Sequence, residues 1–213
     1  LGYKIYRVFK REVEIGKPVL CIGNLVIGGA GKTPLVIKIR QLLSKDFSKI
    51  FVLTRGYLGK DKGPLTVKKT MHYQNVGDES LIHAKFGPTC VSKNKIKGAE
   101  FCKKNGADLI LLDDGLQSIN IKKKISLLVI DPSYGIKNRF LFPSGPLRQS
   151  TNDALKLCDA VVILDKNFDK KKYEFIFHKN IYTGYRELKF SKDIKNKVIA
   201  FSALGNNQNF FES

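Results

Sequence analysis

The sequence contains no closely spaced cysteine pair. Its four cysteines are Cys21, Cys90, Cys102 and Cys158, and none belongs to a Cys-x-x-Cys unit. This spacing excludes the usual zinc sites and gives no basis for a disulfide framework. Three of the four lie in or beside apolar runs, so we expect them to be buried small hydrophobic side chains in a protein of a reducing compartment.

Long apolar runs are also missing. No run approaches the ~20 residues that a helix needs to cross a bilayer, no signal peptide is visible, and no internal repeat is present. The first ten residues are basic and aromatic. They are typical either of the end of a membrane-surface helix or of an ordinary N-terminal helix.

Acidic residues are scarce. The 19 Asp and Glu residues face 38 Lys and Arg, which gives a formal net charge of +19. This balance favours an anionic partner, such as a nucleic acid, an anionic membrane surface or a phosphorylated substrate, although a base-composition bias toward Lys, Asn, Ile and Phe would give the same balance. No DNA- or RNA-binding motif is present and Lys far outnumbers Arg, so we expect no nucleic-acid partner.

Short apolar runs alternate with helical patterns along the chain. We expect strands at 19–23, 50–53, 89–91, 109–112, 126–130 and 160–164, and helices at 33–43, 79–85 and 95–104. This alternation predicts an α/β fold with a mostly parallel sheet flanked by helices, whose ligands bind beyond the carboxyl ends of the strands. The length of 213 residues suits a core domain over 1–165 and the start of a smaller C-terminal lobe over 166–213.

The strongest motif follows the first strand. It reads Val26-Ile27-Gly28-Gly29-Ala30-Gly31-Lys32-Thr33 and opens a helix, which is the context of a P-loop. The glycines allow backbone N–H groups to surround phosphate oxygens, Lys32 would reach the β- and γ-phosphates, and Thr33 would hold Mg²⁺. Val26 stands where the usual pattern has Gly, and the alternative is a glycine-rich turn that binds nothing. The motif predicts a P-loop NTPase-like fold that uses ATP and Mg²⁺.

Carboxylates occupy two further positions beside expected elements. Asp113 and Asp114 follow the strand at 109–112, where an acid completes the Mg²⁺ site of P-loop proteins, although Asp-Asp-Gly also favours a simple turn. Asp78 and Glu79 lie at a loop-to-helix junction. Asp78 is a candidate general base for an acceptor hydroxyl or a plain N-cap, and Glu79 could join the metal site through water.

Basic residues also follow strand ends and rigid loops. Arg55 comes directly after the second strand, and Asn138, Arg139 and Arg148 flank a loop rich in Pro and Gly. The three arginines are candidates for binding a substrate phosphate or the transferred phosphoryl group. Structural salt bridges are the alternative for each of them.

Taken together, these motifs resemble those of the tetraacyldisaccharide 4'-kinase family of lipid A biosynthesis. The matching segments are Gly23-Asn24, Gly28 to Pro34, Thr54 to Tyr57, Val76 to Glu79, Asp113 to Gln117, Asn138 with Leu141 to Arg148, and Phe201 to Gly205 with Phe210-Phe211. Gly-Lys-Thr-Pro alone is unspecific. Its combination with Asp-Asp-Gly-Leu-Gln and Pro-Ser-Gly-Pro-Leu-Arg is specific.

The resemblance implies an ATP- and Mg²⁺-dependent kinase that phosphorylates the 4'-hydroxyl of tetraacyldisaccharide 1-phosphate. It implies peripheral attachment to the cytoplasmic face of the bacterial inner membrane, and we expect a monomer. Asp78 aligns with the family's catalytic base, and Asp113 and Asp114 align with its metal-binding acids. Lys32 and Arg148 complete the expected catalytic set, and Arg55, Asn138 and Arg148 the expected substrate contacts.

The sequence departs from the family pattern at several positions. Leu58 stands where Gly is usual, Ser118 and Asn206 where His is common, and Gln149 where Glu is common. The family's N-terminal membrane helix and part of its C-terminal lobe have no counterpart in this sequence. The rival interpretations are an inactive truncated relative and a regulatory ATPase of the deviant P-loop kind, against which Ile27 argues because that class has Lys at this position.

Overall fold

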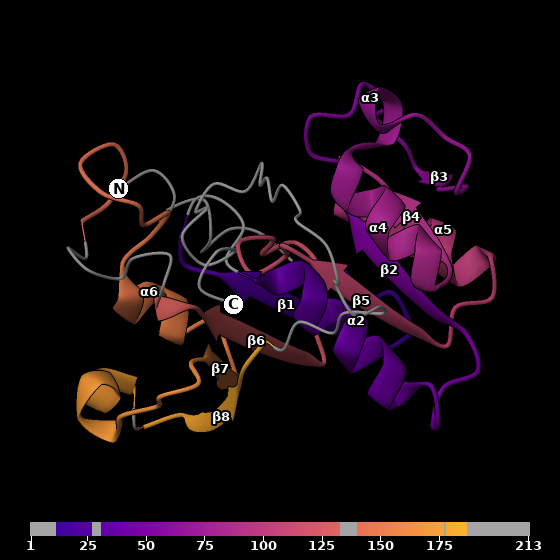
Figure 1. The fold of residues 1–213 in the computed structure, drawn as a ribbon. Helices are drawn as coiled ribbons and strands as arrows, with labels where there is room; N and C mark the ends of the chain where they lie inside the picture. The colour runs from indigo at the N-terminus through magenta and orange to yellow at the C-terminus, as the bar shows by residue number, and fades with distance from the viewer. Residues whose placement is uncertain (1–11, 27–30, 133–139, 177, 187–213) are drawn as a thin grey trace, which may run out of the picture.

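The protein is built around one eight-stranded sheet. The structure, a computed structural model, describes residues 12–26, 31–132, 140–176 and 178–186 (Figure 1). The strands are β1 (Val19–Asn24), β2 (Ile50–Thr54), β3 (Leu65–Thr66), β4 (Thr89–Val91), β5 (Leu109–Asp113), β6 (Ile125–Ile130), β7 (Ala160–Leu164) and β8 (Asn180–Gly184). Their order is β3-β4-β2-β5-β1-β6-β7-β8, and all neighbours pair in parallel except β3 with β4.

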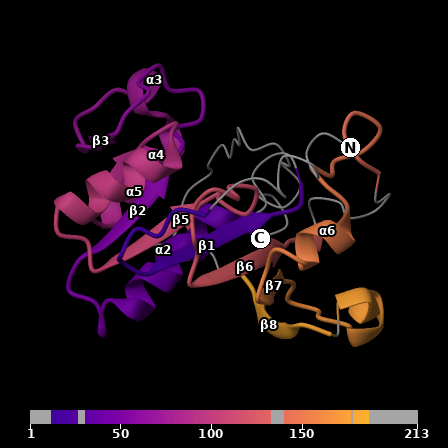
Figure 2. The same ribbon diagram turned by 180° about the vertical axis from the view of Figure 1, so that it is seen from behind.

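The helices lie on the two faces of this sheet. They are α2 (Lys32–Leu43), α3 (Tyr73–Val76), α4 (Asp78–Phe86), α5 (Lys95–Lys104) and α6 (Thr151–Leu155), followed by a 3-10 helix, η2 (Lys170–Ile176). On one face, Val36 of α2 packs with Ile22, Val52 and Leu111. The opposite face carries α5 and α6 (Figure 2). Both faces are therefore covered, which explains why the central strands are continuous apolar runs.

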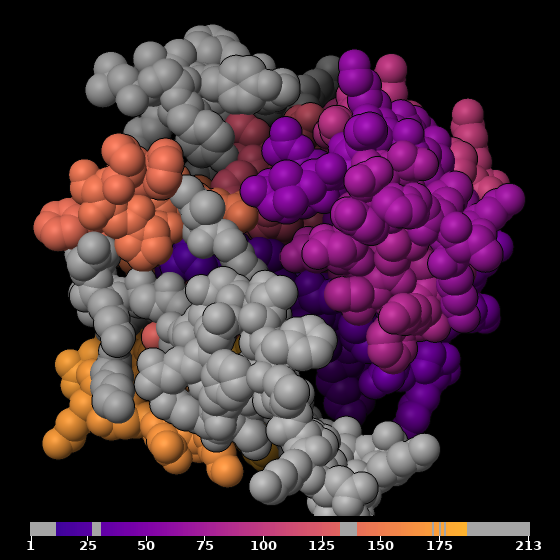
Figure 3. Space-filling view, turned by 45° about the horizontal axis from the view of Figure 1, so that its top comes forward, coloured from indigo at the N-terminus to yellow at the C-terminus, as the bar shows by residue number. Residues whose placement is uncertain are grey.

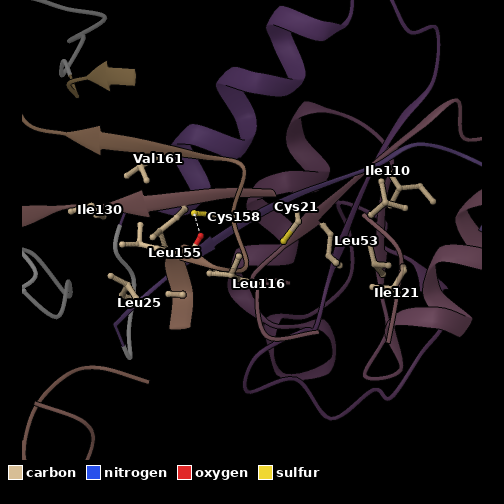
Figure 4. Close-up of a cluster of buried hydrophobic side chains, with 14 of the residues drawn as sticks. Cys21, Leu25, Leu53, Ile110, Leu116, Ile121, Ile130, Leu155, Cys158 and Val161 are labelled. Carbon is tan, nitrogen blue, oxygen red and sulfur yellow. Dashed lines mark hydrogen bonds between the residues drawn. The ribbon is translucent and has the colours of Figure 1, made fainter. Parts of the chain in front are cut away.

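The larger core cluster lies under α5 and α6. Cys21, Leu53 and Leu116 meet in its centre, and Leu155 and Cys158 extend it toward β6 and β7 (Figure 4). All four cysteines are free and buried, as expected for small apolar side chains. Burial raises the pKa of the Cys21 thiol to about 11, so this side chain stays a neutral core residue.

The expected elements agree with the structure within a residue or two at their ends. Two strands were not predicted, the two-residue β3 and β8, and neither were the short helices α3 and α6. Strand β8 lies beyond residue 165 and pairs with β7, so the described residues after 165 extend the same sheet. The expected domain boundary stays a prediction, because 187–213 lie outside the described residues. No helix in the described part of the chain is long and apolar enough to cross a membrane.

Two groups of residues occupy opposite sides of the molecule. In the space-filling view, residues of the N-terminal half (indigo to magenta) form one side and residues from 140 onward (orange to yellow) form the other (Figure 3). Strand β1 lies between β5 and β6, so the segments that follow all three strands converge at one edge of the sheet. The candidate site forms at this edge.

Candidate active site

The glycine that precedes the P-loop lysine is fixed by its surroundings. Gly31 caps the N-terminus of α2 with φ 66°. A Cβ at this position would lie 2.8 Å from Leu164 Cδ1 and 3.3 Å from Asp131 Oδ2. Both the left-handed backbone and the close contacts therefore require glycine. Val26, the residue that departs from the usual motif, is buried and bridges to Leu147, while 27–30, which carry the other expected phosphate contacts, lie outside the described residues.

The P-loop lysine begins helix α2 and faces an acid. Lys32 is buried, with 7% of its surface exposed, and its Nζ lies 3.5 Å from Asp114 Oδ1. Thr33 follows in the first helical turn and is partly buried. Pro34 is compatible with this turn because its position needs no N–H donor. Lys32 is therefore an ammonium held at the helix N-terminus, where phosphate groups bind.

The two aspartates after β5 point in different directions. Asp113 is the last residue of the strand and is 2% exposed. Asp114 has φ 54°, and its N–H donates to Ile22 O at 2.9 Å. This left-handed residue ends the strand, and its side chain is 35% exposed although Oδ1 is buried. The pair thus supplies one buried acid and one acid at the mouth of the site.

The Asp114 carboxylate lies between two cations. Arg148 Nη1 donates to its Oδ2 at 2.8 Å, and Lys32 approaches its Oδ1. Burial by itself would raise the pKa of Asp114, but the charges of Lys32 and Arg148 outweigh it and hold the pKa below its ordinary value. Arg148, predicted as a phosphate-binding residue, thus lies in the same cluster as the P-loop lysine.

Two buried side chains around Asp113 escaped the sequence analysis. His83 Nε2 lies 3.0 Å from Asp113 Oδ2, and both side chains are buried. Lys95 Nζ donates to Asp113 O at 3.4 Å. Burial lowers the pKa of Lys95 to about 8, while Asp113 and Asp114 act in the opposite direction. Neither residue belongs to a recognisable motif, because each is one of several polar residues on its helix and nothing in the sequence marks it as buried.

The expected base and its neighbour begin helix α4. Asp78 is exposed, and its Oδ1 accepts from Glu79 N at 2.8 Å, while Gly77 holds the N-cap position. The plain N-cap alternative is therefore wrong for Asp78. Burial raises the pKa of Glu79, and the charge of Asp113 adds to this effect. The structure thus brings the α4 acids near the acids that follow β5.

The loop after β2 packs against the start of α4. A Cβ at Gly77 would lie 2.5 Å from Tyr57 O, so the two loops touch through glycine. Arg55 is exposed, and its positive charge contributes to the lowered pKa of Lys95. Arg55 therefore lies on the same side of the sheet edge as Lys95. Leu58 has φ 59°, which explains why glycine would suit this position. Asn138 and Arg139 lie outside the described residues.

The oxygen atoms at this edge fit a magnesium ion. Asp113 Oδ1 is buried and has no hydrogen-bond partner among the described residues. No three His, Cys, Asp or Glu side chains in the described part of the chain group as a metal site. Mg²⁺ is usually bound by one or two carboxylates together with substrate phosphates and water. Thr33 and Asp113, with Asp114 beside them, suit that arrangement.

Another aspartate follows the strand on the other side of β1. Asp131 comes directly after β6, is 4% exposed, and accepts a hydrogen bond from Arg186 Nη2. Its Oδ2 lies against the Gly31 backbone. Arg186 follows β8, so this ion pair ties the edge of the sheet to the P-loop.

Comparison with known proteins identifies the family. The family profile described as LpxK, tetraacyldisaccharide-1-P 4'-kinase, matches residues 3–213. This chain belongs to the tetraacyldisaccharide-1-P 4'-kinase family.

Individual relatives agree with this membership. A tetraacyldisaccharide 4'-kinase of Paramagnetospirillum magneticum is 37% identical over all of this chain and 67% of its own length. That of Parvibaculum lavamentivorans is 42% identical over 68% of this chain and 43% of its own length. The crystal structure of LpxK from Aquifex aeolicus in complex with ATP has a TM-score of 0.72 and 27% identity, and the match covers 85% of this chain and 57% of that chain. The chain spans about half the length of most curated relatives it matches.

Proposed function

We propose that this chain carries the catalytic core of an ATP-dependent kinase that phosphorylates the 4'-hydroxyl of tetraacyldisaccharide 1-phosphate. The observation that carries the proposal is the cluster that the P-loop lysine, Lys32, forms with Asp114 and Arg148 at the carboxyl edge of the sheet. The chain that contains this cluster is a member of the family. The related LpxK was crystallised with ATP, which supports ATP as the phosphoryl donor.

The proposed reaction is an in-line transfer. The 4'-oxygen forms a bond to the γ-phosphorus, the bond from that phosphorus to the bridging oxygen of ADP breaks, and the hydroxyl proton goes to Asp78. Lys32 and the backbone N–H groups at the start of α2 stabilise the negative charge on the phosphates. Bound Mg²⁺ would neutralise phosphate charge, and Thr33, Asp113 and Asp114 would hold it, with Glu79 contributing through water.

The arginines have a supporting electrostatic role. Arg148 holds Asp114 ionised and supplies positive charge at the mouth of the site. Arg55 lies on an adjoining loop and is exposed, so it is available to an anionic acceptor. We propose that Arg55, Arg148 and Asn138 contact the acceptor phosphate. A regulatory ATPase would need none of these acceptor contacts.

We also propose that the carboxyl edge of the sheet contacts an anionic membrane surface at the cytoplasmic face of the inner membrane. Phe140, Leu141 and Phe142 are consecutive and are 62%, 50% and 67% exposed. They precede Arg148 in the same loop, and the chain carries a net charge of +19. Aromatic side chains next to basic ones favour the bilayer interface. A monomer without a nucleic-acid partner remains our prediction.

The kinase activity is tested by transfer of labelled γ-phosphate from ATP to tetraacyldisaccharide 1-phosphate in detergent. We expect transfer by the wild type and a loss of about 10²-fold or more in kcat for Asp78→Ala, because the hydroxyl loses its base. Asp46→Ala removes another exposed aspartate, at the end of α2, and should retain full activity. Equal activity of the Asp78 and Asp46 variants would remove Asp78 from the mechanism.

The membrane contact has a separate test, which uses the absence of tryptophan in this chain. Phe142→Trp gives a single reporter on the exposed loop, and Phe86→Trp places a second exposed reporter at the end of α4, where Phe86 is 50% exposed. With anionic phospholipid vesicles, we expect a blue shift and quenching by brominated lipid for Trp at 142 only. The same response at both positions, or none at 142, would contradict this orientation.

A further inference from the structure

His83 makes a buried contact that joins two parts of the site. It lies on α4, the helix that starts with Asp78 and Glu79, and its side chain is 0% exposed. Its Nε2 lies 3.0 Å from Oδ2 of Asp113, which is the last residue of β5 and 2% exposed. The contact therefore connects the helix of the expected base to the strand of the expected metal ligand.

The direction of this hydrogen bond follows from the chemistry of the two groups. An ionised carboxylate can only accept, so Nε2 carries the proton and donates to Oδ2. Nδ1 is buried and has no partner among the described residues. Burying an imidazole costs free energy unless its polar atoms are satisfied, and an apolar side chain would fill this space without that cost. The hydrogen bond to Asp113 is therefore the contribution of the His83 ring that an apolar side chain could not make.

The hydrogen bond selects which oxygen of Asp113 is available. Oδ2 is held by His83, and Oδ1 is buried without a partner in the described part of the molecule. Fixing one oxygen also fixes the rotation of the carboxyl group. Hydrogen bonds of this kind orient metal-binding carboxylates in general, and removing them typically lowers metal affinity or activity by about 10–100-fold.

The backbone that carries His83 is itself anchored. Arg40, on the helix that begins with Lys32, donates to His83 O at 3.4 Å. It also donates to Ile50 O and Pro88 O, each at 2.6 Å. A buried guanidinium with three carbonyl partners holds α2, α4 and the start of β2 together. These hydrogen bonds hold the His83 backbone in place, and so help to keep its ring beside Asp113.

We propose that His83 is a positioning residue that holds the Asp113 carboxylate so that Oδ1 faces the divalent cation of the nucleotide. The role rests on the proposed function only in assuming that this edge binds a metal–nucleotide complex. It is independent of which acceptor receives the phosphoryl group. His83 touches neither substrate in this scheme and acts through Asp113 alone.

The test compares ATP binding with and without Mg²⁺ by titration calorimetry, on the full chain. We expect Mg²⁺ to tighten ATP binding to the wild type. His83→Leu should keep the metal-free affinity within about twofold and lose about tenfold of the Mg²⁺-dependent gain. His83→Gln, whose amide N–H can take the place of Nε2–H, should restore most of that gain.

Two further variants separate positioning from stability. His83→Asn is too short to reach Asp113 and should behave like Leu, so it replaces Leu if that variant does not fold. Thr89→Val removes the hydrogen bond of a different fully buried side chain, whose hydroxyl donates to Gly87 O at 3.1 Å, and should leave the Mg²⁺ effect unchanged. Folding of each variant is confirmed by thermal melting.

Three outcomes would overturn the proposal: an unchanged Mg²⁺ effect in folded His83→Leu or His83→Asn, an equal loss in Thr89→Val, or no Mg²⁺ effect in the wild type. Failure of the lipid kinase assay is a different result. A wild type that binds Mg²⁺ and ATP as expected but transfers no phosphate to the disaccharide would reject the proposed acceptor and leave the role of His83 supported.

Discussion

Two acidic positions flank the P-loop strand, and they differ in what surrounds them. On one side of β1, Asp113 and Asp114 follow β5 and meet His83, Lys32 and Arg148. On the other side, Asp131 follows β6 and binds Arg186. Both positions are aspartates at the carboxyl ends of neighbouring parallel strands. Position at a strand end alone therefore does not distinguish a metal ligand from a structural ion pair.

The partner groups make the distinction. Around β5, one carboxylate oxygen of Asp113 is buried without a described partner, and the left-handed Asp114 keeps its side chain partly exposed. Around β6, the Asp131 carboxylate is buried against Gly31 and its cation comes from the far edge of the sheet. The first arrangement leaves coordination capacity for a ligand, and the second fastens the sheet to the P-loop.

The largest expected effect is on catalysis at the β5 side. Lys32→Ala removes the ammonium that faces Asp114 and the phosphates, so we expect kcat to fall by roughly 10³-fold. Asp131→Asn, on the β6 side, should stay within about tenfold of the wild type, because it loses the charge but keeps its shape, and its amide oxygen can still accept from Arg186. The labelled-phosphate assay measures both. A reversed order would assign the catalytic role to the β6 side.

The cations beside the two acidic positions differ in burial: Lys95 is buried, whereas Arg186 is 40% exposed. The burial of Lys95 predicts an effect of pH on stability. Lys95 has a pKa of about 8 when folded, against 10.5 when exposed. The folded chain therefore binds fewer protons than the unfolded chain between these values, and stability rises with pH across that window. Lys95→Met should remove this rise, which is at most ~3 kcal/mol.

Urea unfolding at pH 7, 8.5 and 10 checks this expectation. The stability difference between Lys95→Met and the wild type should be largest in favour of the variant at pH 7 and should shrink toward pH 10. Arg186 is 40% exposed, so Arg186→Met serves as the control without such a trend. A stability difference that does not change with pH would contradict the lowered pKa of Lys95 in the folded chain.

A smaller effect is expected when the structural ion pair is broken. Asp131→Ala leaves Arg186 without its carboxylate, but the guanidinium is partly exposed and can be hydrated, so we expect a loss of about 1–2 kcal/mol in the free energy of unfolding. Arg186→Met should destabilise more, because it takes this cation away from the buried Asp131 carboxylate. Denaturant unfolding of both variants and of the double variant measures the coupling, and additive losses would contradict a direct pair.

The smallest expected effect is a shift in the acid limb of the pH–rate profile. Arg148 helps to hold the pKa of Asp114 below its ordinary value. In Arg148→Met this carboxylate should protonate at a higher pH, so the fall in kcat/KM on acidification should begin at a higher pH than in the wild type. Rates between pH 4.5 and 8 measure it. A limb that shifts equally in Asp131→Asn would place the titrating acid elsewhere.

Much of the fold follows from sequence patterns, and the exceptions have physical causes. The central strands are fully apolar because helices cover both faces, and this makes β5 and β7 easy to predict. Strand β8 has mostly exposed or half-buried residues and no such pattern, so it was missed. The P-loop and the β5 acids were predicted because their chemistry requires a short contiguous motif.

The supporting residues of the site could not be predicted in the same way. His83 and Lys95 are each one of several polar side chains on their helices, and only their hydrogen bonds to Asp113 of β5 give them a role. Leu58 was known from the sequence only as a departure from glycine, and its left-handed backbone gives the reason. The role of such residues is set by three-dimensional neighbours and not by spacing along the chain.

The strand order has a consequence for the nascent chain. Val19 of β1 pairs with Ile110, and Leu20 pairs with Ile125, so both partners of the central strand are translated long after it. Strand β2 can pair with β4 before β5 is made, but until β5 leaves the ribosome the edges of β1 and β2 that face it stay open to chaperones and to aggregation. The candidate site can therefore assemble only after Asp113 and Arg148 have emerged, although the P-loop lysine is translated before both.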